Sequence, residues 1–500
     1  MSKRVLRSVI FVIWVGLAIW LIRFEAFPER FSHTLTGYKS FLSENTLLED
    51  SWMRILFHGE PIGYSHSSVE INDDDPERHY TASGTVHVRL KMLGTDQRIQ
   101  MKTLVGIDSL WNLQVFTFKL FGEAYNLRIS GHREKGNSFR VAIKTPHGLT
   151  RTQMVIPDDV IIYSPMMDMA MRKLKPGQNL TIKTLDPMSM ATIQMTIHAV
   201  RRETLEMDGA KHEAMLLTTD FSGAEIRSWI DTDGVLLKQE TPFGWIMERC
   251  TPDAAFEALK AAGAASDMLD RLAIPCEGTL KNPRTAQAIH LRFKGVAFQP
   301  DELQTHRQTV NVSTGNVSEI TVRRESAFPK TAAPLSAETR ASLKPYLESS
   351  NFVQAKDPAL QKAAAKIVGD EQDPSRQAQA IFHWVHDNVR KEMTVSLPSA
   401  LDVLKTMAGD CNEHTYLFVG LARAAGLPSR INVGLAYQNG AFYYHAWPSV
   451  YVGRWVECDP TWGQETVDAT HISLVKGELA DQIQIIKVMG RLKIQVVGEE

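Results

Sequence analysis

Three residues in the last third of the chain have the types and order that a thiol hydrolase requires. Cys411 lies in G-D-C-N-E-H-T, His445 in F-Y-Y-H-A-W and Asp459 in W-V-E-C-D-P-T-W-G-Q. In this chemistry a cysteine sulfur attacks a carbonyl carbon, a histidine accepts and returns the proton, and a carboxylate fixes the tautomer of the imidazole. The sequence therefore predicts nucleophile, base and orienting group in chain order.

Cys411 is expected in the first turn of a helix. Asp410 can cap that helix, Glu413 completes a capping box, and Gly426 and Pro428 end it. Between these signals, apolar residues follow at helical spacing: Leu417, Phe418, Leu421 and Ala425. Because a helix N-terminus favours negative charge and has free N–H groups, we predict a lowered pKa for the Cys411 thiol and a donor for an oxyanion.

His445 and Asp459 are expected to face each other across a hairpin. The aromatic and β-branched runs 442–450 and 454–458 flank Gly453. The midpoint of 445 and 459 is 452, beside that glycine. Directly opposed residues of a hairpin have Cβ atoms roughly 5 Å apart, so the carboxylate is predicted to accept the imidazole N–H.

These motifs resemble the transglutaminase-like superfamily of papain-type fold. The helix-opening G-D-C-N-E-H, the L-A-R-A-A-G-L-P-S-R at its end, Y-H-A-W and D-P-T match its pattern in order and spacing. The resemblance covers about the last third of the chain and implies the triad Cys411, His445 and Asp459. Many members carry an aromatic residue near the position of Lys391. Because this chain departs from the pattern there, the resemblance does not identify a second oxyanion donor. No calcium loop is recognisable, and neither a metal nor a cofactor is expected.

Other histidines and cysteines receive structural interpretations. His414 lies one turn from Cys411 and is a rival base, but no carboxylate is placed to orient it, so a capping or core role is favoured. Cys458 should point away from the face of Asp459 and form part of the core. For the remaining three histidines surface or structural roles are predicted: His383, His386 and His471.

The N-terminal residues predict a membrane anchor. Lys3, Arg4 and Arg7 precede an unbroken apolar run, Val9 to Ile22, and no small-residue cleavage site follows. An uncleaved signal-anchor is favoured over a cleaved signal peptide, with the basic end in the cytoplasm. The expected location is the inner membrane, with a single span and the catalytic domain outside the cytoplasm. In that compartment Cys250 and Cys276 have the option of forming a disulfide.

The overall fold class is predicted to be α+β. Composition is ordinary, with 44% hydrophobic and 22% charged residues, and the net charge of −2 excludes an electrostatic footprint for nucleic acid. Alternating sequences over 45–250 predict an antiparallel β domain, in which the acidic run 73–75 is a turn. The remaining divisions are a tail and anchor at 1–30, a small β region at 285–325, a linker at 328–345, the catalytic domain at 346–480 and a C-terminal strand segment at 481–500.

The sequence thus predicts an exported, membrane-tethered cysteine enzyme that acts on amide bonds through an acyl-thioester. Protease, amidase, deamidase and transamidase reactions share every residue named. The expected substrate is a peptide, protein or peptidoglycan amide, and the membrane is contacted through the N-terminal helix. The alternative is a non-catalytic envelope module that binds or assembles other components and keeps the transglutaminase-like fold.

Overall fold

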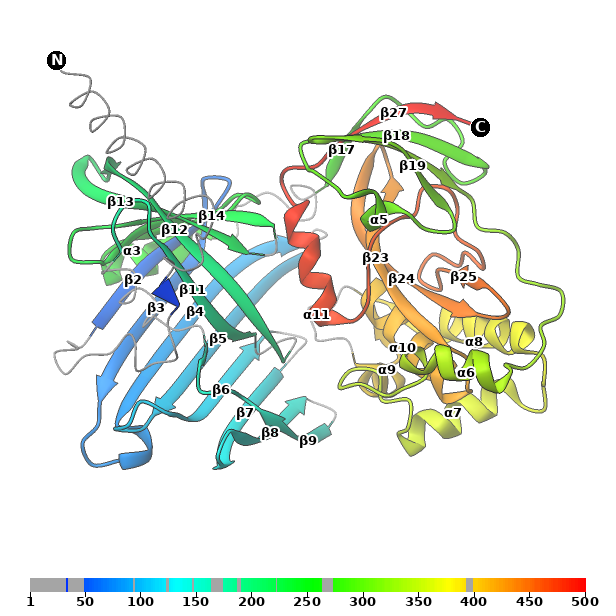
Figure 1. Cartoon of the computed structure of the whole chain (residues 1–500), viewed down its shortest axis with the longest axis horizontal. Helices are drawn as coiled ribbons and strands as arrows, with labels where there is room; N and C mark the ends of the chain where they lie inside the picture. The colour runs from blue at the N-terminus through cyan, green and yellow to red at the C-terminus, as the bar shows by residue number, and fades with distance from the viewer. Residues whose placement is uncertain are drawn as a thin grey trace, which may run out of the picture.

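The computed structural model describes two β-rich bodies with a group of helices on one side (Figure 1). It describes residues 33–34, 49–92, 95–122, 126–145, 148–162, 174–186, 190–221, 223–262, 273–392 and 399–500. The predicted anchor Val9 to Ile22 lies outside these residues. Among the helices that are described, none has the length and apolar character needed to cross a membrane.

The first body is one large, almost wholly antiparallel sheet. Its strand order is β1-β11-β12-β13-β14-β15-β16-β2-β3-β4-β5-β6-β7-β8-β9, with β10 paired to β11. The strands are β1 (His33–Thr34), β2 (Glu49–Phe57), β3 (Glu60–Ile71), β4 (Tyr80–Met92), β5 (Thr95–Ile107), β6 (Leu113–Phe121), β7 (Asn126–Lys135), β8 (Ser138–Thr145), β9 (Gly148–Val155), β10 (Val160–Ile162), β11 (Asn179–Asp186), β12 (Ala191–Met207), β13 (Ala210–Phe221), β14 (Ala224–Ile230), β15 (Leu236–Glu240) and β16 (Trp245–Arg249). The alternating pattern therefore predicted this sheet correctly.

One helix, α3 (Pro252–Ala261), covers part of this sheet. Phe256 of α3 packs against Trp52 of β2 and Tyr64 of β3, with ring centroids 5.4 and 5.3 Å apart. The acidic run is a turn, as predicted, because Asp75 caps the short 3-10 helix η4 (Pro76–Arg78) by accepting from the N–H of Glu77.

The second body is built on a sheet of nine strands. Its order is β19-β20-β18-β27-β17-β24-β23-β26, with β25 paired to β24. The strands are β17 (Ile274–Glu277), β18 (Ala288–Lys294), β19 (Gln308–Thr314), β20 (Val317–Arg323), β23 (Ser429–Gln438), β24 (Ala441–Tyr451), β25 (Trp455–Glu457), β26 (Ile472–Lys476) and β27 (Lys493–Glu499). The strands of the region 285–325 and the C-terminal strand thus extend the same sheet that carries His445.

Helices pack on one part of this second sheet, as Figure 1 shows. They are α6 (Ala337–Ser342), η5 (Lys344–Tyr346), α7 (Pro358–Val368), α8 (Pro374–Asn388), α9 (Ala400–Thr406) and α10 (Cys411–Ala424), with the short strands β21 (Arg390–Lys391) and β22 (Ala408–Gly409). Outside this group, α5 (Pro300–Leu303) contacts β19, and α11 (Leu479–Gln482) and η6 (Ile483–Lys487) contact β26. Helix α10 is central, and its residues from Glu413 to Arg423 are all buried. The predicted linker at 328–345 includes α6, whose N-cap is Ser336.

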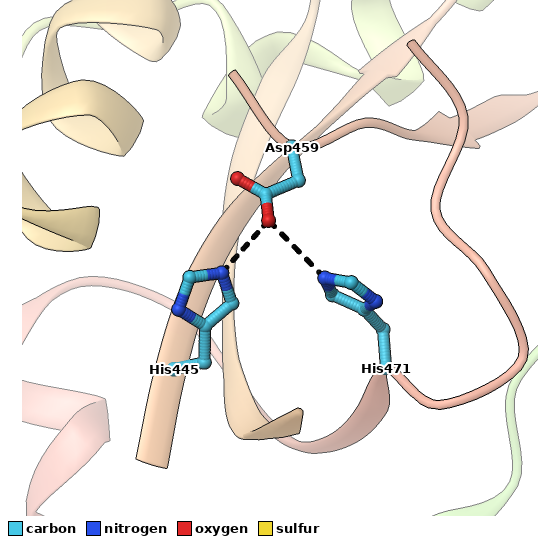
Figure 2. A group of neighbouring side chains, drawn as sticks. All are labelled: His445, Asp459 and His471. Carbon is cyan, nitrogen blue, oxygen red and sulfur yellow. Dashed lines mark hydrogen bonds and ion pairs between the residues drawn. The ribbon is translucent and has the colours of Figure 1, made fainter. Parts of the chain in front are cut away.

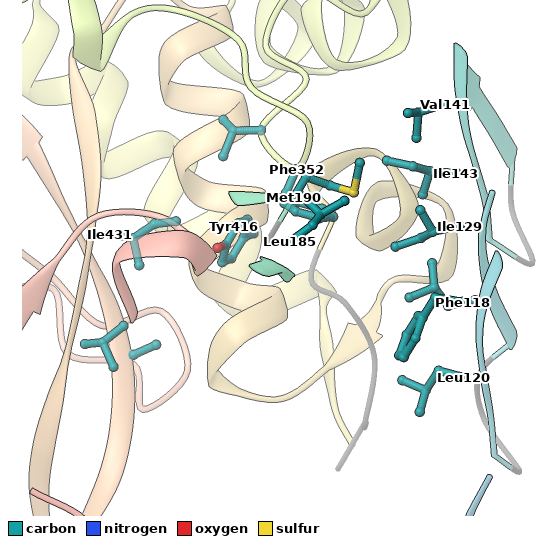
Figure 3. Packing of buried hydrophobic residues seen from close by; sticks show 14 of the residues in the cluster. Phe118, Leu120, Ile129, Val141, Ile143, Leu185, Met190, Phe352, Tyr416 and Ile431 are labelled. Atoms are coloured by element: carbon teal, nitrogen blue, oxygen red, sulfur yellow. The ribbon is translucent and has the colours of Figure 1, made fainter. Parts of the chain in front are cut away.

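A single apolar cluster joins the two bodies. On the first sheet it includes residues such as Phe118, Ile129 and Ile143, and on the helical side it includes Phe352 and Tyr416. Figure 3 shows the side chains of β6 to β8 pointing toward the helical part. One face of the large sheet therefore packs in the core, so the opposite face of the sheet points away from it.

Candidate active site

Cys411 begins α10 within the predicted capping box. The Asp410 carboxylate accepts from the N–H of Asn412 at 2.8 Å, and the Glu413 carboxylate accepts from the N–H of Asp410 at 3.0 Å. A Cβ atom on Gly409 would lie 2.1 Å from the Cβ of Glu413, so only glycine fits before this cap. Local sequence therefore sets the position of the thiol at the first residue of the helix.

The thiol of Cys411 lies beside strand β24, where the backbone of Ala446 hydrogen-bonds to it. Ala446 directly follows His445. On this edge β24 pairs with β17 at residues 441–442 and with β25 at 449–451, so no named strand pairs with the residues between. The sulfur thus occupies a gap in the strand pairing next to the histidine.

The predicted low pKa of Cys411 is wrong. Burial of the thiol and the adjacent Asp410 carboxyl raise its pKa well above the ordinary value, and this outweighs the hydrogen bond from Ala446. Burial and the neighbouring Glu413 also raise the pKa of Asp410. The sulfur therefore rests as a neutral thiol and needs a base before it can attack.

His445 and Asp459 are hydrogen-bonded, with Nε2 of the imidazole 2.8 Å from Oδ2 of the carboxylate (Figure 2). The hairpin is present, but its register differs from the prediction. Val450 pairs with Val456 and Tyr451 with Trp455, so the hairpin is centred on residue 453 and not on residue 452. Strand β25 ends at Glu457, and the chain then turns. Asp459 reaches His445 from this turn and not from an opposed strand position.

The Asp459 carboxylate is buried, and both of its oxygens accept hydrogen bonds. Oδ1 accepts from the N–H groups of Thr461 and Trp462 at 2.8 and 3.2 Å, and Oδ2 faces His445 and His471. Burial alone would raise its pKa, but the two imidazoles lower it below the ordinary range. An ionised Asp459 requires Nε2 of His445 to carry hydrogen, which leaves Nδ1 of that ring to accept a proton.

His471 lies beside the site as a buried, hydrogen-bonded residue, which agrees with the structural one of the two roles predicted for it. It is fully buried, with Nε2 3.2 Å from Asp459 and Nδ1 3.1 Å from Asp468. Burial would lower its pKa, but the hydrogen bonds to these two carboxylates raise it. An imidazolium, which donates from both nitrogens, fits between them. The one sequence signal was Asp468 three residues before His471, and their partner Asp459 comes from another segment.

Two arginines from the connections before β18 and β19 hydrogen-bond to residues around this group. Arg284 donates to Asp468 at 2.7 Å, and its guanidinium lies 4.6 Å from the ring centroid of Trp462. Trp462 in turn stacks on His445 at 4.6 Å. Arg307 is buried, and it donates to Glu457 at 2.7 Å and to the carbonyl of His471 at 2.8 Å. The region 285–325 and the segment before it therefore contribute to the site.

The other residues considered in the sequence lie apart from this chemistry. His414 is buried, and its Nδ1 faces the carbonyl of Asp410 at 2.7 Å, so it has the structural position that was favoured. Cys458 is a buried core thiol, as predicted. Cys250 and Cys276 are both free cysteines. His383 pairs with Glu465 at the surface, and His386 faces the carbonyl of Pro460 at 2.8 Å.

Within the described part of the chain, one group has the composition and spacing of a metal site. The ligand atoms of His445, Asp459 and His471 lie within 4.8 Å of one another. Both imidazole Nε2 atoms are hydrogen-bonded to Asp459, and Nδ1 of His471 is hydrogen-bonded to Asp468, so these atoms are already paired within the protein.

Comparisons with known proteins agree with the geometry. The Transglutaminase-like superfamily matches residues 361–460. An uncharacterized protein from Haemophilus influenzae is 29% identical over 132 residues, which is 24% of this chain and 36% of that protein. The chain therefore matches only about a third of that relative's length.

Two solved structures are similar to part of this chain at low identity. A candidate cysteine protease from Cytophaga hutchinsonii is 18% identical, with 43% of this chain and 88% of that chain covered at a TM-score of 0.30. The periplasmic domain of TgpA from Pseudomonas aeruginosa is 14% identical, with 36% of this chain and 90% of that chain covered at a TM-score of 0.23. Residues 361–460, which contain Cys411, His445 and Asp459, match the core described for the Transglutaminase-like superfamily, as the sequence motifs indicated.

Proposed function

We propose that this protein is a cysteine enzyme that acts on amide bonds through an acyl-thioester at Cys411. One observation carries the proposal. The thiol lies at a helix N-terminus against the backbone of Ala446, and the residue before Ala446 is a histidine held by a buried carboxylate. These are the positions of nucleophile, base and orienting group in thiol hydrolases.

The first half of the reaction follows from the protonation states of the site. His445 Nδ1 takes the proton of the neutral Cys411 thiol as the sulfur attacks the carbonyl carbon, and the carbonyl π electrons move to oxygen. Asp459 stabilises the imidazolium that forms. The oxyanion then re-forms the carbonyl, the C–N bond breaks, and His445 gives its proton to the departing nitrogen. The product of this half is an acyl-thioester and a free amine or ammonia.

The second half decides the reaction class. If water attacks the thioester, His445 accepts the proton of water and returns it to the sulfur, and a carboxylic acid leaves. If a second amine attacks, the product is a new amide. Protease, amidase, deamidase and transamidase activities all use these steps, and the proposed substrate is a peptide, protein or peptidoglycan amide.

The proposed location is the outer side of the inner membrane. It is supported by the basic residues Lys3, Arg4 and Arg7 before the apolar run Val9 to Ile22, because positive flanking charge is retained in the cytoplasm. An enzyme in that place has envelope peptides and peptidoglycan within reach.

A chromogenic ester tests the acyl-thioester without knowledge of the natural amide. The full chain, mixed with p-nitrophenyl acetate, should release p-nitrophenol in a stoichiometric burst and carry acetyl on Cys411, as found by peptide mass spectrometry. Cys411→Ala should abolish the burst, whereas the matched control Cys458→Ala should keep it. A burst that persists in Cys411→Ala, or acetyl found only on Cys458, would contradict the assignment of Cys411 as the nucleophile.

The alternative is an envelope module that binds partners and has kept the fold. The raised pKa of Cys411 is the observation in its favour, because a neutral buried thiol is less reactive than a thiolate. Absence of any burst across neutral and alkaline pH, in a folded protein, would support this alternative.

A further inference from the structure

The large sheet carries a row of four cations on four neighbouring strands. Lys102 of β5 pairs in register with Lys119 of β6, Lys119 with Arg128 of β7, and Arg128 with Lys144 of β8. Lys102, Arg128 and Lys144 are exposed, and Lys119 is partly exposed. Directly paired residues have Cβ atoms roughly 5 Å apart, so four like charges are held side by side.

This row lies on the face that points away from the catalytic core. Because side chains alternate along a strand, the neighbours of these cations in sequence point the other way. Those neighbours include Phe118, Ile129 and Ile143, which belong to the apolar cluster shared with the helices and point toward them in Figure 3. The cationic face of β4 to β9 is therefore turned outward.

The outward face is strongly basic in a chain with a net charge of −2. By register, its described cations are Arg89, Lys91, Arg98, Lys102, Lys119, Arg128, Lys135, Arg140, Lys144 and Arg151. Its described acids are Asp96 and Glu134, which pair with Arg89 and Arg140. Ten cations and two acids give this face a charge of +8, and the four cations of the row have no ion-pair partner among the described residues.

Such a row destabilises the sheet by itself, because like charges directly opposed across strands repel. Contact with water does not require cations at these positions, because serine and threonine occupy neighbouring outward positions on the same strands. The charge is neutralised if the face rests on an extended anionic surface.

Apolar groups on the same face indicate what kind of surface this is. Val155 of β9 shares the outward register, because it pairs with Ser138 of β8, and it is 69% exposed. A cleft of about 450 Å³ also opens on this face, lined by Arg89 and Arg98 together with Phe121 and Leu259. Cations interspersed with exposed apolar side chains can contact lipid headgroups and acyl chains at the same time. A fully hydrophilic polyanion would bind the cations but would not bury the apolar side chains.

We propose that the outward face of β4 to β9, centred on Lys102, Lys119, Arg128 and Lys144, docks on the anionic phospholipid surface of a membrane. The sheet then lies flat on the bilayer, and the catalytic body, on the opposite side of the sheet, faces away from the lipid. This proposal is independent of the chemistry assigned to Cys411.

Vesicle flotation of the full chain tests the proposal. Wild type is compared on phosphatidylcholine vesicles with and without phosphatidylglycerol, and the measured quantity is the ratio of the two partition coefficients. The N-terminal cations Lys3, Arg4 and Arg7 are the same in wild type and variants, so a change in this ratio between them reports on the sheet. A triple variant neutralises three of the four cations of the row: Lys102→Gln, Lys119→Gln and Arg128→Gln. Each cation near an anionic surface contributes roughly a fivefold preference, so the ratio should fall by roughly 100-fold. High salt should reduce the wild-type ratio in the same direction.

A matched control removes three exposed cations from α7 and the residues before it: Lys356→Gln, Lys362→Gln and Lys366→Gln. It changes the net charge equally and should leave the ratio unchanged. Thermal unfolding shows whether the row variant is folded, and relief of repulsion should keep or raise its Tm. An unchanged ratio in the folded row variant, or an equal loss in the control, would overturn the proposal. Binding to soluble polyphosphate without binding to anionic vesicles would overturn it too.

Discussion

Replacing Glu457 by glutamine should destabilise the protein strongly at neutral pH and hardly at all in acid. Glu457 is fully buried, and its Oε2 accepts from Arg307 at 2.7 Å and from Trp447 at 2.9 Å. Burial alone would raise the pKa of Glu457, but Arg307 and the hydrogen bond from Trp447 outweigh burial and lower the pKa from 4.5 to about 2.

The size of the effect follows from that pKa. Each tenfold change in a protonation equilibrium is worth about 1.4 kcal/mol, so the lowering corresponds to about 3 kcal/mol of folding free energy. Since the pKa is depressed in the folded protein, the contribution is present in full above about pH 4.5. It is lost as the pH falls toward about 2, where Glu457 of the wild type is itself protonated.

Urea unfolding followed by tryptophan fluorescence measures this difference. At pH 7, Glu457→Gln should lose about 3 kcal/mol relative to wild type, and the gap should close progressively between pH 4.5 and pH 2. The matched control is Glu319→Gln, because Glu319 pairs with Arg292 at 2.7 Å in a half-exposed position and should cost less than about 1 kcal/mol. A gap that stays constant with pH would show that Arg307 does not hold Glu457 ionised.

Three further outcomes concern the site. Because burial raises the pKa of Cys411, its alkylation by iodoacetamide should be slow at neutral pH and still accelerate above pH 9, ahead of the more deeply buried Cys458; a plateau below neutral pH would contradict this. Asp459→Asn should lower ester turnover by as much as roughly 10⁴, since an amide N–H facing His445 stabilises the wrong tautomer, whereas His414→Ala should be mild; the reverse order would move the base to α10. Protease added to spheroplasts should digest the catalytic domain while a cytoplasmic marker survives, and protection would refute the proposed orientation.

Local signals in the sequence were sufficient for the elements that carry the site. The capping box of Asp410 and Glu413 is closed within four residues, so it fixed the start of α10 without tertiary information. The hairpin was also predicted, because Gly453 lies between two strand patterns. Its register was not, because Asp459 leaves the strand after Glu457 and reaches His445 from a turn.

Properties that depend on distant segments were not predictable in this way. The raised pKa of Cys411 comes from burial, which the first turn of a helix does not reveal. His471 acquires its role through Asp459, twelve residues away, and through Arg284 on another strand connection. The basic row is spread over residues 102–144 and becomes continuous only when strand register aligns it.

The place of β27 in the second sheet has a consequence for biosynthesis. This strand lies between β18 and β17, and β17 pairs with β24, the strand of His445. β27 is translated after every other strand of that sheet. The segments that carry Cys411 and His445 are therefore made before the central strand of the sheet is available to pair. Newly made chains would thus keep an open sheet until β27 is made, and deletion of β27 would remove a central strand of the sheet instead of an edge strand.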